Sequence, residues 1–337
     1  MRPDGWTARP LRIFTWHVHG SYLLYLTQAP HTFYLPVKPG YPAGYAGKRG
    51  HFPWGDNIVD VPAEAVRDME FDCILFQSRQ HWLEDQYAIL SPAQRRLPRI
   101  YLEHDCPREH PVDQRHIVDD PDVLLVHVTH FNDLMWDSGR TPTCVIDHGV
   151  MVPDAARYTG ELARGIVVVN GMRWRGRRAG ADLFAEAREA VPLDLVGMQA
   201  EEMGGLGEIA LPDLPAFVAR YRFFFHPMRY TSLGLAALEA MMVGLPVIAP
   251  ATTEIVTVIE NGVSGYIETN AAALVGHMRR LLDDPAEARR LGEGARRTAL
   301  ERFNIGRFVR DWDDALRLVT GAGAPVYATT APGIGGT

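Results

Sequence analysis

Short apolar runs alternate with longer amphipathic stretches along the chain. Continuous apolar runs that end in a polar turn are typical of strands buried on both faces, as in a parallel sheet. In the first half of the chain these runs lie at 11–16, 31–36, 71–76, 99–103, 123–128 and 144–146. Helical spacing follows at 21–28 and 82–89. Alternating strands and helices predict an α/β fold with a parallel sheet.

The second half repeats this pattern and predicts a second sheet. Its apolar runs lie at 166–170, 193–197, 223–225 and 247–249, and helical patterns lie at 181–190, 235–243, 272–282, 286–301 and 305–318. We expect two domains, residues 1–155 and 156–303, joined by a hinge between about 150 and 164. A loose lead-in at 1–10, a separate last helix at 304–320 and a disordered tail at 321–337, rich in Gly, Ala, Pro and Thr, complete the prediction.

Composition narrows the class of protein. With 337 residues and 47% hydrophobic content, the chain can bury two cores. Its net charge of −7 argues against nucleic acid as a partner. Three widely spaced cysteines predict neither a disulfide framework nor a thiolate metal site and fit a reducing cytoplasm. No window reaches the roughly 18 apolar residues of a transmembrane span. Peripheral contact with the inner face of a membrane remains compatible with this pattern.

The segment 223–267 contains the strongest candidate chemistry. A strand ends at Phe225, and a helix of small and apolar residues begins near Leu235. Thr231, Ser232 and Gly234 therefore lie at a helix N-terminus, where free N–H groups and the helix dipole favour a phosphate. Glu239 lies inside this apolar helix, so its carboxylate requires a partner. A pair of sugar hydroxyls and a buried arginine are both candidates.

The same segment resembles a known family. The run S-x-G-L-A-A-L-E-A-M-x-x-G-L-P-V, followed by T-E-I-V and N-G-x-S-G-Y, resembles the nucleotide-binding signature of retaining glycosyltransferases of family 4, also called "glycosyl transferases group 1". The resemblance implies the GT-B fold, in which two Rossmann-like domains face each other across a cleft and the last helix crosses back to the first domain. It also implies metal-independent transfer from a nucleoside-diphosphate sugar to an acceptor hydroxyl, with retention and without a cofactor.

The resemblance assigns roles in donor binding. Glu239 matches the residue that holds the ribose hydroxyls, and the backbone of Gly234 and Leu235 matches the segment that meets the diphosphate. In the loop 171–180, Arg173 and Arg178 match the basic residues that neutralise the diphosphate, although Arg175 and Arg177 are alternatives to Arg178. The chain departs from the pattern at Thr231, where the family usually has a glutamate that contacts the donor sugar.

The resemblance also assigns a candidate catalytic residue. His104 directly follows the strand 99–103, and in the family a histidine at this place reaches the donor sugar near the reacting carbon. We expect further residues of the cleft to lie near it or near the base and the sugar: His19, Gly20, Asp105, Gly197, Ile209 and Glu254. His148 stands where the family usually has an asparagine.

Three other functions are compatible with the sequence. Thr231 allows a nucleotide-sugar-binding protein without transferase activity, and the architecture allows a nucleotide-sugar epimerase. Eleven of the 13 histidines precede residue 150, and the pairs His17/His19 and His127/His130 suggest a metal-dependent hydrolase. For the transferase, we expect a glycan or lipid-linked acceptor in bacterial polysaccharide or glycoconjugate biosynthesis.

Overall fold

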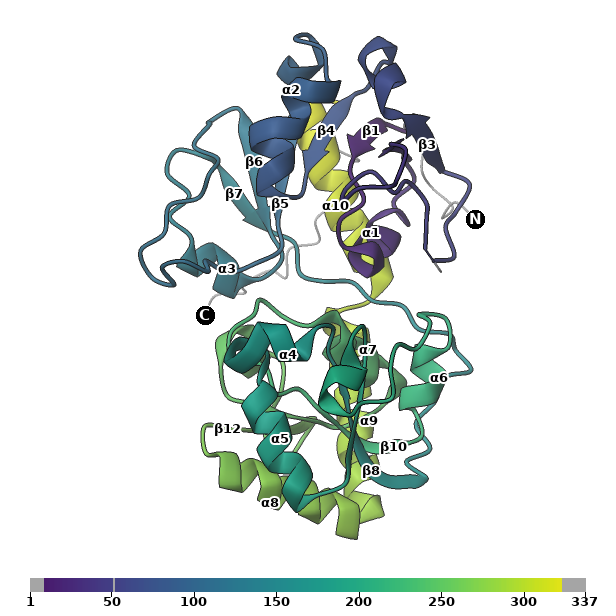
Figure 1. Ribbon diagram of the computed structural model, residues 1–337, viewed down its shortest axis with the longest axis vertical. Coiled ribbons are helices and arrows are strands. Elements are labelled where there is room, and N and C mark those ends of the chain that lie inside the picture. Colours follow the sequence, from purple (N-terminus) through teal and green to yellow (C-terminus); the bar gives the residue numbers. More distant parts are fainter. Residues whose placement is uncertain (1–8, 51, 323–337) are drawn as a thin grey trace, which may run out of the picture.

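The computed structural model describes residues 9–50 and 52–322. Most of the expected lead-in and tail, residues 1–8 and 323–337, therefore lies outside the described residues. The described chain forms two parallel sheets, one in each half of the molecule, with helices packed around them (Figure 1). This confirms the predicted α/β class.

The first sheet has seven parallel strands in the order β3-β2-β1-β4-β5-β6-β7. Its central strands are almost entirely buried, which explains why their sequences are continuous apolar runs. The strands are β1 (Arg12–Thr15), β2 (Thr32–Val37), β3 (Ile58–Pro62), β4 (Cys73–Phe76), β5 (Arg99–Glu103), β6 (Val123–His127) and β7 (Thr143–Val145).

The second sheet has five parallel strands in the order β12-β11-β10-β8-β9. All five residues of its central strand β10 are buried, including Phe223, Phe224 and Phe225. The strands are β8 (Leu162–Val168), β9 (Leu193–Val196), β10 (Tyr221–Phe225), β11 (Val247–Pro250) and β12 (Gly265–Glu268).

Helices connect the strands. In the first domain they are α1 (Gly20–Leu26), α2 (Gln86–Ile89) and α3 (His130–Met135). In the second they are α4 (Met172–Arg175), α5 (Ala181–Ala190), α6 (Leu214–Val218), α7 (Leu235–Val243), α8 (Ala271–Asp283) and α9 (Pro285–Arg302). The last helix, α10 (Ile305–Thr320), packs against α1, β4 and β5 of the first domain (Figure 1).

The chain passes twice between the domains, and the two passages lie side by side. Val150 N donates to Phe303 O at 2.9 Å, and Val150 also forms a bridge with Asn304. Gly149 is required here, because a Cβ at this position would lie 2.2 Å from the Cβ of Phe308. The two passages therefore form one short double connection between the domains.

Several elements differ from the sequence-based prediction, among them the short helix α4 inside the expected loop 171–180. β3 and β12 are edge strands of only five and four residues that the apolar pattern did not predict, since edge strands are short and partly polar. The short helix α3 was also missed. β8 begins at Leu162, inside the expected hinge, because Arg164 gains a carboxylate partner in Asp194 on the neighbouring strand. A charged strand residue of this kind does not appear in an apolar pattern.

Strand order brings the candidate residues together. The order changes direction between β1 and β4 in the first sheet and between β8 and β10 in the second. Loops at the carboxyl ends of strands beside such switch points form the usual ligand sites of open α/β sheets. Most candidate residues follow β1 and β5 in the first sheet and β8 and β10 in the second, and the two sets of loops meet at the domain interface.

Candidate active site

Four hydrogen bonds cross the domain interface at the candidate residues. Tyr25 Oη donates to Glu239 Oε1 at 2.6 Å, and Ser232 Oγ donates to His104 O at 2.7 Å. His148 Nε2 donates to Leu233 O at 3.1 Å, and the backbone N–H of Phe131 donates to Glu254 Oε2 at 2.8 Å. The interface therefore brings residues of both domains into direct contact.

Helix α7 positions Glu239. Its Ala, Leu and Met residues favour a helix, and Gly244, at a φ of 107°, ends it. The helix is apolar on nearly every side and is buried accordingly. Glu239 is only 8% exposed, and burial raises the pKa of its carboxyl. Among the described residues, Tyr25 is its one hydrogen-bond partner, and no ion pair involves it. The buried arginine considered from the sequence is thus not its partner.

The N-terminus of α7 carries no side-chain cap. Its N-cap is Gly234. A Cβ at this position would lie 2.8 Å from Cε1 of His226, so glycine allows the ring of His226 to lie close to the backbone. Leu235 is the first residue of the helix and is half-buried, as is Thr231. Ser232 is buried and uses its hydroxyl on His104 O instead of an anion. Backbone N–H groups are therefore the donors that remain for a phosphate.

The ring of His104 has a defined tautomer. Gln77 donates its amide N–H groups to Thr15 Oγ1 at 2.8 Å and Trp16 O at 3.0 Å, so its Oε1 is an acceptor. His104 Nε2 lies 3.1 Å from this Oε1 and therefore carries the proton. Burial, reinforced by the neighbouring His19, lowers the pKa of His104 well below its usual value. The ring is neutral at pH 7, and its Nδ1 can accept a hydrogen bond from a substrate.

The other residues expected near His104 lie beside it. His19 is the N-cap of α1, and its ring centroid lies 4.2 Å from that of His104. Gly20 follows, where a Cβ would lie 2.1 Å from the ring of Phe52. Asp105 is half-buried and pairs with Arg108 at 2.6 Å. His19, Gly20 and Asp105 thus belong to one cluster of loops in the first domain.

The arginines of the loop 171–180 fall into two groups. Arg177 is paired with Asp182, and Arg173 is exposed and donates to Glu202 O at 3.4 Å. Among the described residues, Arg175 and Arg178 have no carboxylate partner within salt-bridge distance. Burial lowers the pKa of Arg175, and the charge of Arg178 acts in the same direction. Arg173, Arg175 and Arg178 therefore carry the charge of this loop that no described carboxylate neutralises.

The remaining candidates occupy two different environments. Gly197, at a φ of 133°, donates its N–H to Gly207 O, and Ile209 lies half-buried on the loop that follows. Glu254 is buried at the interface and accepts hydrogen bonds from Phe131 N, Thr257 Oγ1 and Arg302. Both carboxylate oxygens of Glu254 accept hydrogen bonds from protein groups, so this side chain connects the two domains in the structure.

Several residues of the site were not identified from the sequence. Tyr25 lies in an apolar helical pattern, and nothing in its neighbourhood along the chain indicates a contact with Glu239. The sequence could have indicated Gln77, because a polar residue directly after a buried strand such as β4 is a candidate for a ligand site. The same reasoning applies to His226, which directly follows β10. These side chains gain their roles through contacts between distant segments.

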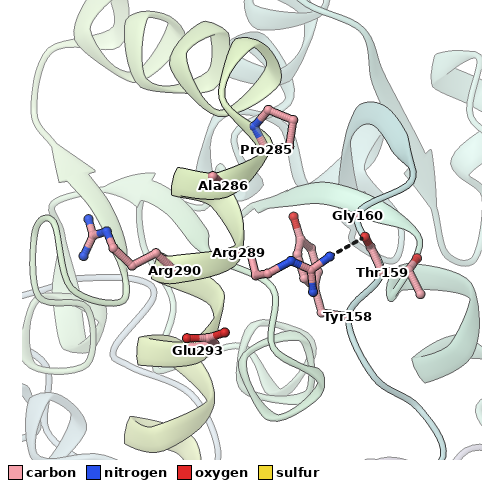
Figure 2. Close-up of a pocket in the computed structure, with 8 residues that line it drawn as sticks. All are labelled: Tyr158, Thr159, Gly160, Pro285, Ala286, Arg289, Arg290 and Glu293. Atoms are coloured by element: carbon pink, nitrogen blue, oxygen red, sulfur yellow. Dashed lines mark hydrogen bonds between the residues drawn. The ribbon is translucent and has the colours of Figure 1, made fainter.

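A recess of about 300 Å³ lies away from this interface. Figure 2 shows the guanidinium of Arg289 beside the ring of Tyr158, with Pro285 and Ala286 above them. The backbone N–H of Tyr158 donates to Val243 O at the C-terminal end of α7, which is the end opposite to Gly234. None of the candidate residues lines this recess.

The histidine pairs make other contacts in the described part of the chain. His17 Nδ1 lies 2.7 Å from Gly47 O, and Nε2 of buried His127 lies 3.7 Å from Asp133. In residues 9–50 and 52–322, no group of three or more His, Cys, Asp or Glu side chains could hold a metal ion. No helix among these residues is both long enough and apolar enough to cross a bilayer.

Four buried histidines predict acid sensitivity. Burial lowers the pKa of His81 to about 3 and the pKa values of His127, His148 and His226 to about 4, from an ordinary 6.5. The unfolded chain therefore binds more protons than the folded one below pH 6.5. We expect the free energy of unfolding to fall as pH decreases toward 4, by up to about 1.4 kcal/mol per pH unit for each histidine. Urea unfolding at several pH values measures this.

His148→Gln is a matched variant for this prediction. A glutamine amide reaches the position of Nε2 and can still donate to Leu233 O, but it does not titrate. We expect the variant to lose about one histidine's share of the pH dependence. A wild-type protein whose stability is constant over this range would contradict the assignment of neutral buried histidines.

Comparison with known proteins extends this description. Residues 201–298 match the family model described as "Glycosyl transferases group 1". No curated protein sequence matches the chain. Among solved structures, sucrose-phosphate synthase from Thermosynechococcus elongatus has a TM-score of 0.66 at 18% identity, over 94% of this chain and 100% of that chain. Anabaena HepE in complex with UDP-glucose has a TM-score of 0.65 at 15% identity, over 91% and 100%.

A third similar structure is larger than this chain. It is a mutant of S. aureus TarM in complex with fondaparinux, alpha-GlcNAc-glycerol and UDP, with a TM-score of 0.57 at 13% identity over 72% of this chain and 55% of that one. These similarities define the fold as GT-B. The chain thus has the GT-B fold, and residues 201–298 of its second half match the glycosyl transferases group 1 model.

Proposed function

We propose that the protein transfers a sugar from a nucleoside diphosphate to an acceptor hydroxyl, with retention at the anomeric carbon and without a metal ion. The observation that carries the proposal is Glu239, a buried carboxylate without a cation, one turn inside a helix whose N-terminus is uncapped. A ribose supplies hydroxyl donors for the carboxylate, and a diphosphate supplies an anion for the N–H groups. HepE and TarM have been solved with UDP, which supports a nucleotide donor for this chain as well.

The geometry supports specific roles. As the bond from the anomeric carbon to the diphosphate oxygen breaks, negative charge grows on the leaving diphosphate. Arg175, Arg178 and the N-terminus of α7 stabilise that charge, and Arg173 remains a further candidate. In the proposed front-face attack, the acceptor oxygen bonds to the anomeric carbon and its proton passes to the leaving diphosphate. His104 orients the sugar by accepting a hydroxyl hydrogen bond at Nδ1.

A panel of nucleotide sugars tests donor binding. We expect one of the UDP-, GDP-, dTDP- and ADP-sugars to stabilise the protein by about 2.7 kcal/mol at 100 times its dissociation constant. Thermal unfolding measures the shift, and transfer to a glycan or lipid-linked acceptor is then assayed with and without EDTA. Stabilisation by no member of the panel would contradict the proposed donor site. We further propose a role in bacterial polysaccharide or glycoconjugate synthesis, at the cytoplasmic side of the membrane.

The arginine loop gives a sharper prediction. Arg175→Ala is expected to weaken nucleoside diphosphate binding about tenfold, because it removes a guanidinium that has no described carboxylate partner and lies within electrostatic range of Asp105 in the first domain. Arg177→Ala is the matched control on the same loop and is expected to change affinity less than about twofold, since this side chain is 77% exposed and is paired with Asp182, which Arg229 shares. Isothermal titration compares them. Equal losses in both variants would show that the loop acts only through its total charge.

Thr231 favours a second candidate, a nucleotide-sugar-binding protein without transferase activity. A threonine there provides no charge for the donor sugar. Turnover with any donor and acceptor pair would exclude this candidate. Analysis of products without an acceptor separates transfer from epimerisation of the donor.

A further inference from the structure

The only hydrogen bond described for Glu239 comes from the other domain. Tyr25 lies on α1, which faces the second domain in Figure 1, and its hydroxyl is 2.6 Å from Glu239 Oε1. Tyr25 is 3% exposed, so water does not compete freely for this hydroxyl. The contact is therefore a buried, charge-assisted hydrogen bond.

This contact differs from the other bonds across the interface. Ser232 and His148 bond to backbone carbonyls, and Glu254 also has Thr257 and Arg302 as partners. In contrast, Tyr25 is the one described donor to the carboxylate that we assign to the ribose. A buried carboxylate without a donor is costly, so the nucleotide-free protein requires this phenol or a substitute for it.

Tyr25 and a ribose offer the same chemistry to Glu239, since each presents a neutral hydroxyl donor. We propose that Tyr25 is a residue of the donor site whose hydroxyl occupies Oε1 of Glu239 in the nucleotide-free protein and gives way to a ribose hydroxyl when the nucleotide binds. This inference rests on the proposed function.

Tyr25 also lies close to the candidate catalytic residue. Tyr25 and His19 belong to the same short helix, with His19 at its N-cap and 4.2 Å from the ring of His104. Helix α1 therefore contacts both Glu239 and His104.

Tyr25→Phe tests the proposal. The variant removes the competing hydroxyl and keeps the ring, so UDP is expected to bind about tenfold more tightly than to the wild type. Inorganic pyrophosphate, which has no ribose, is expected to bind equally to both proteins. Tyr266→Phe is the matched control, because Tyr266 donates to Glu287 within the second domain at 3.0 Å and is expected to leave UDP affinity unchanged. Isothermal titration measures all three proteins.

The outcomes separate this inference from the proposed function. If UDP and the other nucleoside diphosphates bind neither the wild type nor the variant, the proposed function fails and this inference fails with it. If they bind both proteins equally, or bind the variant more weakly, the donor site stands and the displacement of Tyr25 is wrong. An equal gain for pyrophosphate would also overturn it, since the effect would then not involve the ribose. Should Tyr25→Phe not fold, Tyr25→Met, which keeps the apolar bulk, replaces it in the same measurements.

Discussion

Replacement of Glu239 by alanine is expected to lower the affinity for nucleoside diphosphates at least about 100-fold. In the proposed complex, the carboxylate accepts two ribose hydrogen bonds, and each hydrogen bond to a charged group contributes about 1.5 kcal/mol or more. Glu239→Gln keeps the shape but not the charge and is expected to lie between alanine and the wild type. Isothermal titration with the best nucleotide of the donor panel measures the three affinities.

An exposed glutamate of the same domain provides the control. Glu260 has no described side-chain hydrogen bond or ion pair, so Glu260→Ala is expected to bind as the wild type does. Circular dichroism establishes that each variant is folded. Wild-type affinity in folded Glu239→Ala would show that the nucleotide binds elsewhere.

Replacement of Asp313 by alanine is expected to reduce the free energy of unfolding by about 3 to 5 kcal/mol. Asp313 is fully buried on α10, with His31 Nε2 at 2.8 Å and Arg317 Nε at 2.9 Å. His31 accepts the N–H of Leu11 at Nδ1, so its proton is on Nε2, which lies 2.8 Å from the carboxylate. Alanine leaves the buried guanidinium of Arg317 without a counter-charge, and urea unfolding measures the loss.

Asp311 lies on the same helix and provides a comparison. It forms an i, i+4 pair with Arg307 at 2.6 Å, but its side chain is 40% exposed. Solvent screens such a pair, so Asp311→Ala is expected to cost less than about 1 kcal/mol. Losses of similar size in Asp311→Ala and Asp313→Ala would show that burial does not determine how much each ion pair contributes to the free energy of unfolding.

The fold could be predicted to a large extent because its central strands are buried on both faces. A strand such as β10 has no polar position, so its apolar run is visible in the sequence. The edge strands β3 and β12 were missed because both are short and include an acidic residue, so neither forms a continuous apolar run. The periodicity of α7 and its terminal Gly244 gave that helix correctly, since both signals are local.

The candidate site could be predicted only where local signals exist. Glu239, Gly234 and His104 follow from their places after a strand or inside an apolar helix. The pairing of Arg177 with Asp182 depends on how two consecutive elements pack, and the Tyr25 contact joins residues 214 positions apart. Such contacts depend on the assembled domains, so a single sequence contains no direct signal for them.

The place of α10 has a consequence for biosynthesis. The first sheet is complete once Val145 has been synthesised, but the helix that packs on it, with Trp312 bonded to Tyr22, begins only at Ile305. The part of the chain that leaves the ribosome first is therefore the part that finishes folding last. Until the final helix emerges, an apolar face of the nascent domain is available to chaperones, and a premature stop before Ile305 is expected to leave it permanently uncovered.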